Sequence, residues 1–121
     1  METTLQHQQQ LQFSEVYIAD ITALKDIFLQ VSNLKRVNEI FGIPFLLIKK
    51  KKNITGFASL IINETGETDF KVYHKPDLKP EEKEAFICHA RKFFKKNNSG
   101  NYRNSEQLKS SIDRMINWLN I

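Results

Sequence analysis

The chain has only one cysteine, three prolines and four glycines among its 121 residues. Because Cys88 has no second cysteine to pair with, no disulfide can form within the chain, and this fits a reducing compartment. The few prolines and glycines form no long linker that would divide the sequence. We therefore expect residues 1–121 to fold as a single domain.

Long apolar runs are also missing. One of the longest apolar-rich stretches, residues 57–62, is far shorter than the roughly 20 residues that a membrane-spanning helix needs. The first residues show neither a basic start nor an apolar run, so we see no signal peptide. Residues 1–11 are polar and rich in glutamine, which predicts a loose lead-in. We expect a cytoplasmic protein without membrane contact.

The composition that remains is that of an ordinary globular protein with a basic excess. Hydrophobic residues make up 40% of the chain and charged residues 26%, so a packed core is expected rather than disorder. The formal net charge is +4. A positive charge of this size is compatible with binding nucleic acid, but surplus lysine also keeps proteins soluble.

Apolar periodicity predicts the order strand, helix, strand, strand, strand, helix, helix. The expected strands are residues 13–19, 45–49, 54–63 and 69–74, and the expected helices are residues 21–41, 80–97 and 105–120. Pro80 suits a first helical position, and Glu81 and Glu82 follow in the turn where the helix dipole favours negative charge. This order predicts an α+β fold, with a small, mainly antiparallel sheet covered by helices.

The middle of the chain resembles a known family. The run Phe45 to Ile48 is followed by Lys52 to Ala58, which reads Lys-Asn-Ile-Thr-Gly-Phe-Ala. A polar turn followed by Ile/Val-x-Gly-Phe-Ala is common where two strands meet in GCN5-related N-acetyltransferases, and the surrounding element order over residues 13–97 is similar to theirs. The resemblance implies an acetyltransferase-like fold, and fold alone does not carry function.

The segment that would hold the cofactor departs from the family pattern. The family grips the pyrophosphate of acetyl-CoA with a glycine-containing loop after the fourth strand, because backbone N–H groups must approach the phosphates closely. The matching segment here contains no glycine and consists of His74, Lys75, Pro76, Asp77, Leu78, Lys79 and Pro80. Its two prolines lack N–H donors. We therefore predict no cofactor, no catalytic residue and no metal, although the departure leaves the question of enzymatic activity open.

Three functional hypotheses follow. The favoured one is a non-catalytic or vestigial domain that contacts an unknown protein partner or a second copy of itself. The second is an active acyl-CoA-dependent N-acetyltransferase with an atypical phosphate loop. The third is weak nucleic-acid binding through basic patches. The patches would consist of Lys49, Lys50, Lys51, Lys52, Arg91, Lys92, Lys95, Lys96 and Arg103.

Aromatic residues lie among the basic ones near the C-terminal end. Phe93 and Phe94 fall on the apolar stripe of their helix, which favours a core role over base stacking. Tyr102 and Trp118 are expected to be exposed, and a homodimer could use Trp118 and an open sheet edge. Cys88 and His89 are neighbours on a helix and diverge by about 100°, so they do not form a metal or catalytic pair.

Overall fold

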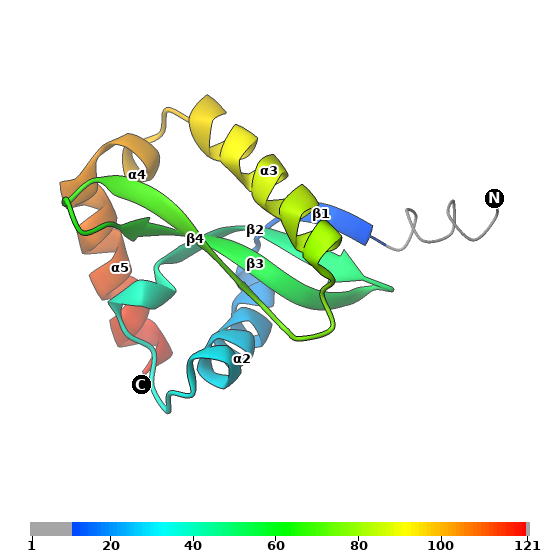
Figure 1. Ribbon diagram of the computed structural model, residues 1–121. Helices are drawn as coiled ribbons and strands as arrows, with labels where there is room; N and C mark the ends of the chain where they lie inside the picture. The colour runs from blue at the N-terminus through cyan, green and yellow to red at the C-terminus, as the bar shows by residue number, and fades with distance from the viewer. Residues whose placement is uncertain (1–10, 121) are drawn as a thin grey trace.

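The computed structural model in Figure 1 describes residues 11–120 and confirms an α+β fold. The expected lead-in falls on residues 1–10, outside the described part, while Leu11 already belongs to the first strand. The strands are β1 (Leu11–Glu15), β2 (Ile43–Lys50), β3 (Asn53–Ile62) and β4 (Thr68–His74). The helices are α2 (Ile21–Ser32), α3 (Pro80–Lys96), α4 (Gly100–Arg103) and α5 (Ser105–Leu119), with 3₁₀ turns at Ile18–Asp20 and Glu39–Phe41.

The sheet is an antiparallel meander in the order β1-β2-β3-β4. Lys51 and Lys52 connect β2 to β3, and both have positive φ (53° and 70°). Two such residues suit the tight hairpin turn whose twist matches that of the strands. In the turn after β3, the Asn63 carboxamide oxygen accepts hydrogen bonds from the backbone N–H groups of Thr65 and Glu67. Short turns therefore set the order of β2, β3 and β4, whereas β1 reaches β2 through the segment that contains α2.

Helices cover both faces of the sheet. Figure 1 shows α2 on one side, with α3 on the other. The α2 face buries Leu24, Ile27, Phe28, Val37, Phe41, Leu47, Phe57 and Tyr73. The α3 face buries Phe45, Leu46, Ile48, Ala58, Leu60, Leu78, Phe86 and Ala90, together with Leu108 and Ile112 of α5. Burial on both faces explains why β2 and β3 are almost continuously apolar.

The last helix joins the two layers. Its start packs in the α3-face cluster through Leu108 and Ile112, while its end packs against the α2-face cluster. The Lys25 ammonium donates to the Leu119 carbonyl at 2.6 Å. The Asn120 side chain both accepts from the Val37 N–H (3.1 Å) and donates to the Val37 carbonyl (2.8 Å). These bonds tie the C-terminal helix to the segment after α2.

Two expected boundaries near the start of the chain are wrong. The first strand ends at Glu15 rather than at residue 19, because the Asp20 carboxylate accepts the Tyr17 N–H at 2.9 Å and tightens the chain into a 3₁₀ turn. The helix expected at 21–41 ends at Ser32. Asn33 then takes the left-handed conformation (φ 54°), which is a common way to end a helix.

Three other differences lie further along the chain. The second strand starts at Ile43 and includes Pro44, which pairs with β3 beyond the end of β1. The polar stretch before α5 contains the short helix α4 instead of a loop only. Tyr102, expected to be exposed, packs against Phe45 and Phe94 in the α3-face cluster. The polar residues around Tyr102 hid this anchoring role.

Burial of two tyrosines predicts a pH dependence. Burial raises the pKa of Tyr73 to about 12, and burial together with the nearby charge of Glu15 raises the pKa of Tyr102 to about 12. The protonated forms therefore contribute stability that is complete below about pH 10 and is lost as the pH rises through about 12. Tyr17→Phe removes the third tyrosine, so that only Tyr73 and Tyr102 contribute to the tyrosinate absorbance. In this variant we expect the absorbance to rise only above about pH 10, together with a falling free energy of unfolding. Ionisation of both tyrosines near pH 10 with unchanged stability would contradict this.

Candidate functional site

The loop between β4 and α3, residues 75–79, lies against the start of β3. The Lys75 N–H donates to the Thr55 carbonyl at 2.8 Å, which extends the β3–β4 pairing by one residue pair. The Thr55 hydroxyl, which is fully buried, donates to the Asp77 carboxylate at 2.5 Å. Leu78 is buried in the α3-face cluster. The loop that would hold a diphosphate is thus fixed by its own side chains.

The N-terminus of α3 is occupied by a carboxylate of the same chain. One oxygen of Glu82 accepts the Lys79 N–H at 2.9 Å and the Lys50 ammonium at 3.0 Å. The same ammonium also donates to the Asp77 carbonyl at 3.1 Å. Only 2% of Glu82 is exposed. A carboxylate here satisfies an end-of-helix N–H group and interacts favourably with the helix dipole.

Lys50 reaches this site because of strand alternation. It follows Ile48 on the α3 face of β2, so its side chain extends toward the start of α3. Lys49, its neighbour in the strand, belongs to the opposite face, where it pairs with Ile54. A run of four lysines in the sequence is therefore split between two faces and a turn.

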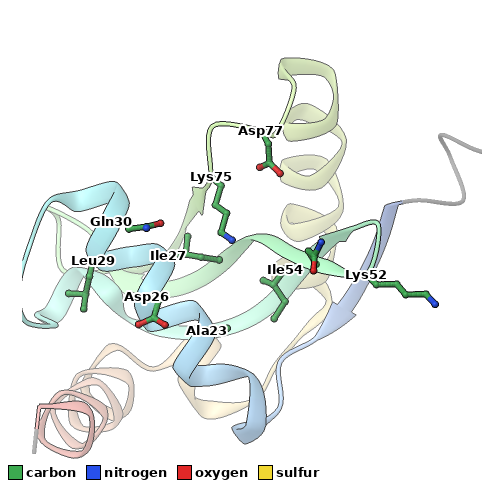
Figure 2. Close-up of a pocket in the computed structure, with 10 residues that line it drawn as sticks. Ala23, Asp26, Ile27, Leu29, Gln30, Lys52, Ile54, Lys75 and Asp77 are labelled. Carbon is green, nitrogen blue, oxygen red and sulfur yellow. The ribbon is translucent and has the colours of Figure 1, made fainter.

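A polar groove of about 760 Å³ lies on the α2 face beside this loop (Figure 2). In the figure the Lys75 side chain points into the space between α2 and β3, whereas Lys52 extends away from it. Asp26 of α2 and Asp77 of the loop supply negative charge at the rim, and Ile27 and Ile54 supply apolar surface. The groove combines charges of both signs with an apolar wall.

Four other residues of the predicted basic patches lie at the far end of α3. The helix rises about 1.5 Å per residue, so Arg91, Lys92, Lys95 and Lys96 are roughly 15–25 Å along its axis from Pro80. They therefore form no continuous patch with the hairpin lysines at the other end. Nucleic-acid binding stays a prediction. A nucleic acid that contacted all of these basic residues would have to reach from the β2–β3 hairpin to the C-terminal end of α3.

Arg103 already has a structural role. Its guanidinium donates to the carbonyls of Asn97 (2.9 Å), Phe94 (2.8 Å) and Lys95 (2.7 Å) and lies 5.2 Å from the centre of the Phe94 ring. These carbonyls end α3, where a cation is favourable. Sequence analysis missed this cap, because an arginine in a polar loop does not reveal which helix end it folds back on.

Other candidate chemistry is dispersed. Cys88 and His89 are exposed, and the His89 ring centre lies 4.9 Å from that of Phe13. Within residues 11–120, no group of three or more His, Cys, Asp or Glu side chains could hold a metal ion. None of the described helices has the length and apolar character to cross a bilayer.

Neither the family models nor the curated proteins contain a match to this chain. The acetyltransferase resemblance of residues 13–97 therefore stays a prediction that rests on the sequence pattern.

The Lys50–Glu82 contact gives a stability prediction. Lys50→Met keeps most of the aliphatic stem but removes the cation beside a buried carboxylate, so we expect a loss of about 2 kcal/mol in the free energy of unfolding. Lys92→Met is the matched control, because Lys92 is exposed on the same helix as Glu82. It should change the stability by no more than about 0.5 kcal/mol. Equal effects of the two substitutions in urea denaturation would contradict the assigned role of Lys50.

Proposed function

We propose that this protein is a non-catalytic domain with an acetyltransferase-like strand order, which acts in the cytoplasm through contacts with other proteins. The observation that carries the proposal is the occupation of the α3 N-terminus by Glu82, held there by the Lys79 N–H and the Lys50 ammonium.

A diphosphate at a helix N-terminus needs free N–H groups that point toward it. Here the Lys79 N–H is used by Glu82, and Pro80 has no N–H to offer. A phosphate in this position would also approach the carboxylates of Glu82 and Asp77. Both are held in place, the first by Lys50 and the second by the Thr55 hydroxyl.

An acyl-CoA cofactor would therefore have to displace an internal ion pair before it could bind in the family's manner. Separating that pair costs free energy, because Glu82 is almost fully buried and Lys50 is only 16% exposed. The acetyltransferase alternative consequently requires either a large rearrangement or a different cofactor position. The non-catalytic hypothesis requires neither.

Exposed apolar side chains support a role in protein contacts. Trp118 is 52% exposed, as expected from its place beside the apolar stripe of α5, and Tyr17 and Ile18 are 68% and 81% exposed. Large aromatic residues are enriched in protein interfaces. Trp118 lies on α5, and Tyr17 and Ile18 lie just before α2. None of the three belongs to the clusters that form the core.

Acetyl-CoA binding tests the proposal directly. We expect no change in melting temperature when acetyl-CoA is added to the full chain, with an active N-acetyltransferase as the positive control. A ligand at about 100 times its dissociation constant stabilises a protein by about 2.7 kcal/mol, which raises the melting temperature of a chain of this size by many degrees. A saturable rise of that kind would overturn the non-catalytic proposal in favour of the acyltransferase alternative.

A further inference from the structure

The outer side of β4 is an open sheet edge. Within residues 11–120 no strand pairs with it, because β4 is last in the order β1-β2-β3-β4. The hydrogen bond from the Lys75 N–H to the Thr55 carbonyl fixes which groups face β3. Alternation along an antiparallel ladder then turns the backbone groups of Tyr73 and Lys71 toward β3 and those of Val72 and His74 outward. Val72 thus presents both a donor and an acceptor to a further strand.

A groove of about 370 Å³ lies beside this edge. It is lined by residues 69–72 of β4 and by Lys83, Ile87 and Arg91 of α3. The three helix residues are spaced by four, so they share one face of α3, next to the core face that carries Phe86 and Ala90. The edge strand and the helix therefore form the two walls of the groove.

The charge of the groove is predominantly positive. Lys83 and Arg91 of α3 contribute two cations, and Asp69 is the one acidic residue in the lining. Lys71 also lines the groove, but its ammonium lies on the α2 face, 5.6 Å from the centre of the Tyr73 ring. The Asp69 carboxylate accepts the Phe70 N–H at 2.8 Å, which holds this acidic group at the start of the strand. Apolar surface from Val72 and Ile87 separates the cations. An occupant with alternating acidic and apolar side chains would match this surface.

We propose that the groove binds an extended acidic segment of a partner protein, which joins the sheet as a strand next to β4. Main-chain hydrogen bonds to Val72 would supply affinity, and the cations would select for acidic side chains. The inference deepens the proposed function, since it names the class of protein contact, and it rests on that function.

The same charges argue against a second copy as the occupant. Pairing β4 with β4 around a two-fold axis would bring the Lys83 and Arg91 side chains of both copies to one interface. Like charges brought together across an interface are destabilising. Charge complementarity therefore favours an acidic partner.

The test uses a fluorescent peptide of about six residues, the usual length of a strand, in which valine and glutamate alternate. We expect fluorescence anisotropy to show binding to the full chain that weakens at higher salt. A peptide with lysine in place of glutamate should not bind. The double variant Lys83→Glu/Arg91→Glu should abolish binding, whereas Lys92→Glu/Lys95→Glu, with the same charge change on the same helix but outside the groove lining, should retain it.

Val72→Pro separates strand addition from simple charge attraction. Proline removes an N–H that faces away from β3, so no bond to β3 is lost directly. We expect binding to weaken about tenfold, the loss of one strand-to-strand contact. Val72→Ala, which keeps the N–H, should bind within a few-fold of the natural protein. Circular dichroism checks that each variant is folded. If Val72→Pro does not fold, the comparison of Lys83→Glu/Arg91→Glu with Lys92→Glu/Lys95→Glu tests the inference instead.

Three results would overturn the inference: no binding of the glutamate peptide, equal binding of the lysine peptide, or a folded Val72→Pro protein that binds normally. Self-association that is lost in Val72→Pro would also overturn it, in favour of a second copy at the edge. Each of these results leaves the acetyl-CoA experiment unaffected, so the failure of this inference and the failure of the proposed function are distinguishable.

Discussion

The Glu82 carboxylate at the start of α3 organises the β4–α3 loop and the elements around it. It satisfies the Lys79 N–H, and it holds the Lys50 ammonium, which in turn reaches the Asp77 carbonyl. One side chain thereby connects β2, the β4–α3 loop and α3. A helix N-terminus that would otherwise attract a foreign anion is used to hold the protein together.

This arrangement also shapes the two surfaces beside the loop. On the α2 face, Thr55 and Asp77 fix the rim of the polar groove into which Lys75 points. On the outer side, β4 leads into the same loop, and none of the strands in residues 11–120 pairs with its outer edge, which lies next to α3. Function through protein contacts needs such an edge more than it needs an open helix N-terminus. An occupied helix N-terminus and an open β4 edge are therefore both compatible with the proposed role in protein contacts.

Sequence analysis predicted the fold class and element order because the apolar spacing of the strands and helices is regular. Boundaries failed where single polar contacts decide them, as when Asp20 ends the first strand early or Asn33 stops α2. At the site, the glycine-free loop was visible in the sequence, and Glu82 was recognised as a favourable first-turn acid. The role of its partner Lys50 was not recognised, because the run of four lysines from Lys49 to Lys52 does not show which of them faces α3. Contacts across 32 residues of chain depend on the strand register.

The most direct test of the central claim follows the backbone amide resonances of Lys79 and Glu82 by NMR while coenzyme A is added to the full chain. If the protein's own carboxylate occupies the helix N-terminus, these resonances should not move beyond the small, non-saturating changes caused by added salt. Saturable shifts centred on Lys79 and Glu82 would show that a diphosphate displaces Glu82, and would contradict the account.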